Sequence, residues 1–171
     1  MGDSVKDEVK LIFRSGMIPD YLNKTLITLI PKYPNPESIG NYRPISLCNS
    51  IYKVITKITM ARIRPKLPEL VSPLQTNFVL GRNEVDNAII VQELIHSISK
   101  KKGRRGAMAI KIDLEKAYDC LEWSFIKDTL KLFKLLDSMI SLIMSCVSTS
   151  TIYVLFNGGA LESFQPIRGI R

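Results

Sequence analysis

Residues 107–113 form an alternating run of large apolar residues and smaller or charged residues, "AMAIKID". Because successive side chains of a β-strand point to opposite faces, Met108, Ile110 and Ile112 would share one face and Asp113 would fall on the other. A strand of this kind has one face on the hydrophobic core and one face open. We therefore expect a half-buried strand that places Asp113 at its carboxyl end, on the polar face.

A carboxylate at a strand end in a basic chain is suited to bringing a hard cation to a phosphate. Mg²⁺ takes oxygen ligands in octahedral geometry, usually one or two carboxylates with waters and substrate phosphates. Asp113 would supply such a carboxylate, and the backbone carbonyl of Leu114 would be a second oxygen in the same turn. An isolated Asp after a strand is more often a turn former or a helix cap, and the pattern alone leaves both interpretations open.

The rest of the chain mixes helical and extended patterns. Apolar residues at helical spacing predict five helices, around residues 5–13 (ended by Gly16), 51–64, 86–98, 126–133 and 137–147. The run Thr25–Ile30 predicts a strand followed by a proline-rich loop that includes Pro44, and 151–164 predicts a hairpin around Asn157 and Gly158. Without a regular βαβ rhythm, this order favours an α+β fold.

Composition narrows the class of protein. A length of 171 residues suits one domain, and a net charge of +8 favours an anionic partner without distinguishing nucleic-acid binding from generic basicity. Three cysteines without a C-x-x-C pair, and no secretory leader, predict reduced thiols in an intracellular, non-secreted protein of the nucleus or cytoplasm. Lysines and an aspartate interrupt the most apolar region, so we expect no membrane span.

Five sequence motifs occur in a characteristic order: "TLITLIPK", "NYRPISLCNSIYKVITKITMARI", "QTNFVLGRNEVDNAIIVQELIHS", "AIKIDLEKAYDCLEW" and "FQPIRGIR". Together they resemble the reverse transcriptase domain of non-LTR (LINE-type) retrotransposons, particularly the plant kind, from about residue 19 to the last. The resemblance implies an RNA-directed DNA polymerase that uses an RNA template, a DNA primer and deoxynucleoside triphosphates. It also implies a right-hand polymerase fold, with fingers over about 19–106 and part of the palm, an antiparallel sheet with packed helices, over about 107–171.

The resemblance also implies roles for single residues near the first aspartate. Asp113 corresponds to a catalytic aspartate that holds two Mg²⁺ ions for in-line nucleotidyl transfer. Tyr118 corresponds to the aromatic residue beneath the incoming sugar, which excludes a 2′-hydroxyl; a core aromatic at the start of a helix is an equal alternative. Asp119 receives no metal, and we expect it to cap the helix through Trp123.

Other positions correspond to the family's substrate contacts. Lys32 and Arg43 match fingers residues that bind the incoming triphosphate, a role that suits an ammonium and a guanidinium. Arg168 and Gly169 match the start of a motif that lines the template and nucleotide pocket. A further segment that matches the family's fingers and template path contains Gln75, Phe78, Gly81, Arg82 and Asn87, of which Gln75, Gly81 and Arg82 are candidate nucleic-acid contacts.

One element of the family pattern has no counterpart. The second metal-binding motif contains adjacent aspartates, and the 171 residues contain no Asp-Asp pair. We therefore expect a C-terminally truncated domain that lacks a palm or thumb segment and does not polymerise DNA alone. The alternatives are a non-catalytic nucleic-acid-binding remnant, a palm completed by a separate chain and, more remotely, an unrelated metal-dependent phosphotransferase.

Overall fold

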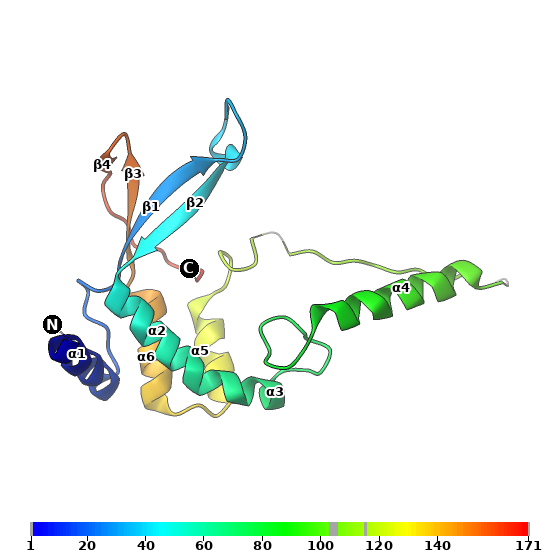
Figure 1. Cartoon of the computed structure of the whole chain (residues 1–171), viewed down its shortest axis with the longest axis horizontal. Coiled ribbons are helices and arrows are strands. Elements are labelled where there is room, and N and C mark those ends of the chain that lie inside the picture. The colour runs from blue at the N-terminus through cyan, green and yellow to red at the C-terminus, as the bar shows by residue number, and fades with distance from the viewer. Residues whose placement is uncertain (1, 103–105, 115, 171) are drawn as a thin grey trace. The chain divides into compact units, whose positions relative to one another are not determined.

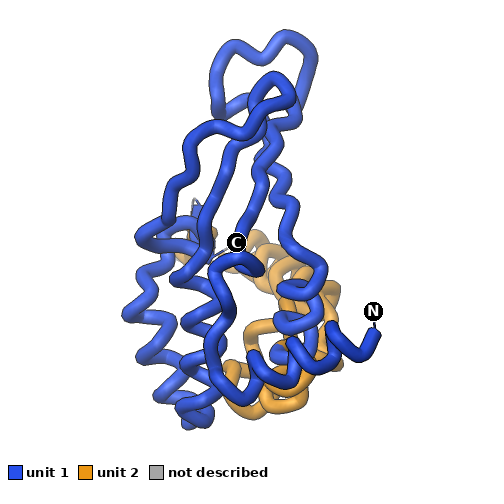
Figure 2. Tube along the Cα trace, turned by 90° about the vertical axis from the view of Figure 1, so that its left-hand side faces the viewer, with its two compact units in different colours: residues 1–59, 116–171 blue, residues 60–115 orange. Residues whose placement is uncertain are grey.

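The computed structural model describes residues 2–102, 106–114 and 116–170, and these form two compact units. Unit 1 comprises residues 1–59 and 116–171, and unit 2 comprises residues 60–115 (Figure 2). The expected division into fingers and palm stays a prediction.

Unit 1 is built on a four-stranded sheet with the strand order β2-β1-β3-β4 (Figure 1). The strands are β1 (Lys24–Pro31), β2 (Tyr42–Cys48), β3 (Thr151–Phe156) and β4 (Gly159–Ala160). β1 pairs antiparallel with β2 and parallel with β3, and β3 pairs antiparallel with β4. The expectation of an antiparallel sheet is therefore wrong for this sheet, because two strands far apart in the sequence run side by side in the same direction.

Strand β2 lies where the sequence predicts a proline-rich loop. Pro44 pairs with Leu29 inside the β1–β2 ladder. A proline lacks the N–H that a central strand must donate, but an edge strand tolerates it. β2 is at the edge of the sheet, with β1 as its neighbour, so the proline and the strand are compatible. A short 3-10 turn, Ile39–Asn41, leads into the strand.

The predicted hairpin after residue 151 is confirmed. Asn157 (φ 47°) and Gly158 (φ 81°) both have left-handed backbone conformations between β3 and β4. Two consecutive positive φ angles are what a type I′ turn requires, and Asn-Gly adopts them readily. Beyond the hairpin, Phe164 returns to Ile152 through a pair of backbone hydrogen bonds of 2.9 and 3.0 Å.

The helices of unit 1 agree with the periodic patterns. They are α1 (Gly2–Ser15), α5 (Trp123–Leu132), α6 (Asp137–Ser148) and most of α2 (Ser50–Ile63), whose last residues belong to unit 2. Gly16 ends α1 as predicted, with φ +68° and a hydrogen bond of 2.9 Å from its N–H to the carbonyl of Ile12.

The core of unit 1 joins α1, α2 and α6. Its buried cluster consists of Ile12, Ile18, Leu22, Ile55, Leu142 and Cys146. Helix α6 is held at its C-terminal end, where backbone carbonyls lack partners within the helix. The buried Asn23 amide donates to the carbonyls of Ser145 and Cys146 and to the Thr149 hydroxyl, and the Tyr52 hydroxyl donates to the Cys146 carbonyl. These bonds fix α6 against α2 and the start of β1.

Unit 2 contains a 3-10 turn (Arg64–Lys66), α3 (Leu67–Leu70) and α4 (Glu84–Lys100). The helix predicted from Asp86 is confirmed, but its cap is Asn83, whose side chain accepts a hydrogen bond of 3.1 Å from the Val85 N–H. Most apolar residues of α4 are exposed, namely Val85, Ile89, Ile90, Val91, Leu94 and Ile95, whereas Ile98 is half-buried.

The strand expected over residues 107–113 is not formed. Residues 106–114 have no regular secondary structure, and Met108, Ile110 and Ile112 are 78%, 72% and 81% exposed. A strand needs a neighbour for its backbone N–H and C=O groups, and none of the described strands pairs with this run. The alternating pattern is therefore present without the ladder and the buried face that it predicts.

Candidate nucleotide-binding site

Two segments far apart in the sequence come together at one place in unit 1. The N–H of Gly169 donates to the carbonyl of Leu121 over 2.7 Å, and the N–H of Ile170 donates to the carbonyl of Tyr118 over 3.0 Å. The turn that begins at Lys116 is thereby joined to the C-terminal segment. Three of the predicted nucleotide-binding residues, Tyr118, Arg168 and Gly169, thus lie within these two adjoining segments.

Gly169 allows this close approach. Its backbone has φ +85°, and a Cβ atom built at this position would lie 2.8 Å from the carbonyl oxygen of Asp119 and 3.1 Å from its Cα. Any side chain here would collide with backbone in a conformation that L-residues rarely adopt. The glycine is thus required by the contact between the segments.

Trp123 strengthens the same junction. Its indole nitrogen donates a hydrogen bond of 2.8 Å to the carbonyl of Gly169. The sequence pattern did not predict a role for Trp123 at the site, although it is the chain's single tryptophan. The expected cap at Asp119 is wrong: α5 begins at Trp123, and its N-cap is Glu122, three residues further on.

The side chains at this junction face outward. Tyr118 is 59% exposed, so the alternative of a core aromatic is excluded. The Arg168 guanidinium lies 3.8 Å from the Glu122 carboxylate in a pair whose side chains are more than half exposed. An exposed pair of this kind contributes little to stability, and its guanidinium remains accessible to an anionic ligand.

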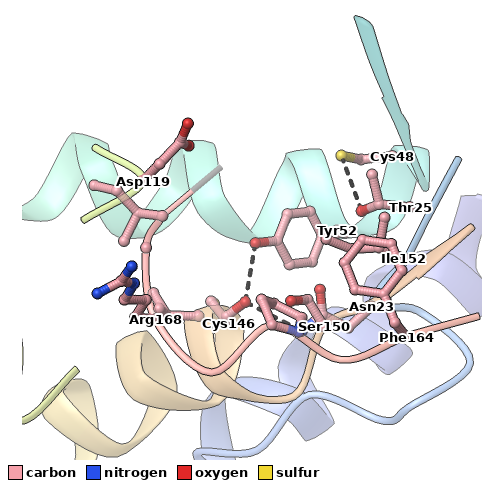
Figure 3. Close-up of a pocket in the computed structure, with 14 residues that line it drawn as sticks. Asn23, Thr25, Cys48, Tyr52, Asp119, Cys146, Ser150, Ile152, Phe164 and Arg168 are labelled. Atoms are coloured by element: carbon pink, nitrogen blue, oxygen red, sulfur yellow. Dashed lines mark hydrogen bonds between the residues drawn. The ribbon is translucent and has the colours of Figure 1, made fainter. Parts of the chain in front are cut away.

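A pocket of about 180 Å³ lies beneath the Arg168–Ile170 segment (Figure 3). Asp119 and Arg168 lie at one end of it, and Thr25, Cys48 and Phe164 at the other. The middle is formed by Tyr52 of α2 and Cys146 of α6.

Burial governs the chemistry of the pocket wall. Burial raises the pKa of the Cys146 thiol to about 11. Burial also raises the pKa of the Tyr52 hydroxyl well above its usual value, and the nearby Cys146 and Cys48 raise it by a smaller amount. Both groups are therefore neutral at physiological pH. Of the other two cysteines, Cys48 is half-buried and Cys120 is exposed.

Lys32 and Arg43 lie elsewhere in unit 1. Arg43 pairs with Ile30 at one end of the β1–β2 ribbon, whereas Thr25, which lines the pocket, pairs with Cys48 at the other end. Five residues of strand at about 3.3 Å per residue separate the two ends by roughly 17 Å. The Lys32 ammonium donates to the carbonyl of Gly40 over 2.9 Å, within the hairpin loop. These two cations therefore belong to the hairpin tip and not to the junction around Gly169.

Asp113 and Leu114 belong to unit 2, and both are exposed. Among the residues that the structure describes, no three His, Cys, Asp or Glu side chains are grouped as a metal site. An accessible carboxylate with a neighbouring carbonyl fits the part of a Mg²⁺ site that a protein supplies when substrate phosphates supply the rest.

Arg82 has a structural role that the sequence did not reveal. Its guanidinium donates to the carbonyls of Ser72, Gln75 (2.6 Å), Pro68 (3.1 Å) and Val71 (3.2 Å). It therefore holds the end of α3 and the loop that follows. Of the two neighbouring candidates, Gln75 is exposed, and Gly81 has φ +79° with open space where a Cβ would lie.

No described helix is long and apolar enough to cross a membrane.

Three relatives align with most of this chain. The uncharacterized 149 kDa protein of transposon TX1 from Xenopus laevis is 26% identical over 93% of this chain. The Pol polyprotein of retrotransposable element R2DM from Drosophila melanogaster is 24% identical over 95% of the chain, and that of element R2 from Popillia japonica is 23% identical over 84%. The chain spans 12%, 15% and 20% of their respective lengths. The family model for reverse transcriptase (RNA-dependent DNA polymerase) matches residues 30–170. The chain therefore belongs to the reverse transcriptase family.

Proposed function

We propose that this chain forms part of the RNA-directed DNA polymerase of a non-LTR retroelement of the plant kind, acting inside the cell on an RNA template, a DNA primer and deoxynucleoside triphosphates. The observation that carries the proposal is the junction between the Tyr118 turn and the Arg168–Gly169 segment. It brings together residues that the family pattern assigns to one nucleotide pocket, although about 50 residues of sequence separate them.

The residues at the junction suit different parts of a nucleotide. The exposed ring of Tyr118 offers a flat apolar face to a sugar, and the Arg168 guanidinium offers several donors to a phosphate or a base edge. We assign Lys32 and Arg43, at the hairpin tip, to the triphosphate of the incoming nucleotide. They lie at the end of the β1–β2 ribbon away from Thr25 and Cys48.

Asp113 is the proposed metal ligand of the chain, with the Leu114 carbonyl beside it. Two Mg²⁺ ions would activate the primer hydroxyl and stabilise the leaving pyrophosphate in this reaction. One carboxylate neutralises little of the repulsion between two divalent ions. We therefore propose that residues 1–171 alone bind nucleic acid but do not extend a primer.

The direct test is primer extension on an RNA template with Mg²⁺ and deoxynucleotides, run beside equilibrium binding of the same primer–template duplex. Asp113→Asn removes the charge while preserving size, and Asp128→Asn is the matched control at an exposed position of α5. We expect salt-dependent duplex binding by all three proteins and no incorporation by any of them.

Other outcomes decide between the alternatives. Incorporation that Asp113→Asn loses and Asp128→Asn keeps would show that the remaining carboxylates come from within the chain, and would refute the proposed inactivity. Binding without incorporation, followed by activity when a downstream segment of the polymerase is added in trans, would support a site completed from outside residues 1–171. Failure to bind the duplex at low salt would refute both the enzyme and the binding remnant.

A further inference from the structure

We infer that the pocket beneath the Arg168–Ile170 segment binds a small, uncharged aromatic molecule of one or two rings. Arg168 and Gly169 line this pocket and also belong to the proposed nucleotide site. The inference concerns binding to unit 1 and does not require the chain to polymerise DNA.

The size of the pocket sets the size of the ligand. Its volume of about 180 Å³ is close to that of an apolar cavity that accommodates benzene, about 150 Å³. It is smaller than the roughly 300–1,000 Å³ of sites for drug-sized ligands. A nucleoside triphosphate therefore does not fit, whereas one ring or two fused rings do.

Three polar side chains of the wall, Asn23, Tyr52 and Thr25, already have partners, which favours an uncharged ligand beside them. The Asn23 amide is bonded to the end of α6, the Tyr52 hydroxyl donates to the Cys146 carbonyl, and the Thr25 hydroxyl lies 3.6 Å from the Cys48 sulfur. A charged ligand would lose its hydration without gaining a partner from these groups. The charged side chains of the lining, Asp119 and Arg168, are at one end of the pocket (Figure 3).

The remaining lining favours aromatic over aliphatic ligands. Tyr52 and Phe164 contribute aromatic rings to the lining, which also includes Cys48 and Cys146. Aromatic rings pack edge to face or offset on one another, and polarizable sulfur makes favourable contacts with ring edges. Ile152 and Val147 complete the apolar surface.

A ligand bound in the pocket would affect the contact between the Tyr118 turn and the Arg168–Gly169 segment. Phe164, Arg168 and Gly169 form one wall, and the opposite wall is fixed by the hydrogen bonds between α2 and α6. A ligand that fills the space would contact the C-terminal segment through these residues. Trp123, whose indole nitrogen is bonded to the Gly169 carbonyl, would report the change. This coupling to a nucleotide pocket rests on the proposed function, whereas the binding itself does not.

The experiment is titration of the whole chain with toluene and with indole, observed through the methyl NMR signals of Val147 and Ile152. Benzoate and benzylammonium are charged probes of similar size. We expect saturable shifts of both methyl signals with toluene and indole, intermolecular contacts to those methyl groups, and at least about tenfold weaker binding of the charged probes. Toluene should also change the emission of Trp123.

Two variants separate this pocket from other apolar surfaces. Ser150→Leu places a larger side chain in the pocket wall, and Ser138→Leu is its control at an exposed position of α6. We expect Ser150→Leu to weaken toluene binding at least about tenfold and Ser138→Leu to leave it unchanged. If Ser150→Leu does not fold, Phe164→Ala, which removes an aromatic wall at a half-exposed position, should weaken binding severalfold. Equal binding by folded pocket variants, or contacts that map to the exposed apolar residues of α4, would overturn the inference.

Discussion

The indole nitrogen of Trp123 donates to the carbonyl oxygen of Gly169 over 2.8 Å, and so joins the first residue of α5 to a segment 46 residues later in the chain. The amide of the same glycine donates to Leu121. Gly169 is therefore held on both sides of its Cα, in a conformation that only glycine adopts without strain. The geometry around Arg168 depends on this arrangement.

Gly169→Ala should destabilise unit 1 by about 2 kcal/mol or more, because the new Cβ meets the Asp119 backbone in addition to the cost of a positive φ. Gly158→Ala is the matched control, with φ +81° but open space around the Cβ, and should cost only about 1 kcal/mol. Chemical denaturation of both variants measures the difference. Equal losses would mean that the contact with Asp119 relaxes freely.

Asn23→Ala should cost about 1–3 kcal/mol, because it removes the hydrogen bonds that the buried amide donates to the last turn of α6. The Tyr52 hydroxyl still donates to the Cys146 carbonyl, and the Thr149 hydroxyl still donates to the Ser145 carbonyl. Asn41→Ala removes one hydrogen bond, to the Tyr33 hydroxyl in the exposed hairpin loop, and should cost less than about 1 kcal/mol. Thermal unfolding monitored by circular dichroism compares the two. A small effect at Asn23 would show that water replaces its amide.

Arg82→Lys should loosen unit 2, because an ammonium cannot reach four carbonyls in the planar geometry of a guanidinium. Amide hydrogen exchange over residues 68–82 should speed up at least about tenfold, which corresponds to roughly 1.4 kcal/mol. Lys66→Arg, at an exposed ion pair with Glu69, is the control and should leave exchange unchanged. If Arg82→Lys weakens duplex binding while exchange stays the same, Arg82 contacts nucleic acid directly.

The stability of unit 1 should fall with rising pH above about 9. The thiol of Cys146 has a folded-state pKa of about 11, raised from 9.0 by burial, so the folded state favours the protonated form. Its contribution is complete below pH 9 and is lost as the pH rises toward 11, with a slope of at most about 1.4 kcal/mol per pH unit. Denaturation curves at pH 8 to 11 for the chain and for Cys146→Ala should differ in this slope. Identical slopes would assign the alkaline loss to other groups.

Much of the helical structure was predictable because it depends on local signals. The stripe from Val5 to Phe13 and the stop at Gly16 define α1, and Asn157-Gly158 defines the hairpin turn. These signals need only a few neighbouring residues. They do not depend on residues elsewhere in the chain.

The rest depends on pairing between distant segments, which a local pattern does not encode. β1 pairs in parallel with β3, more than 100 residues later, and β2 forms despite Pro44 because it falls at the edge. The run at 107–113 has the pattern of a strand but finds no partner among the described strands. At the site, the family motifs located Tyr118, Arg168 and Gly169, whereas nothing near Asn23 or Arg82 indicated the backbone carbonyls that each would bind.

The order of segments in unit 1 has a consequence for synthesis on the ribosome. Residues 1–59 provide β1, β2 and part of the core, but β3, α6 and the partners of Asn23 and Tyr52 come only after residue 116. Residues 1–59 therefore expose apolar surface while residues 60–115 are translated. Such non-local closure slows folding and prolongs exposure to aggregation. A nascent chain arrested before residue 116 should be captured by chaperones, and one that has passed residue 170 should be released.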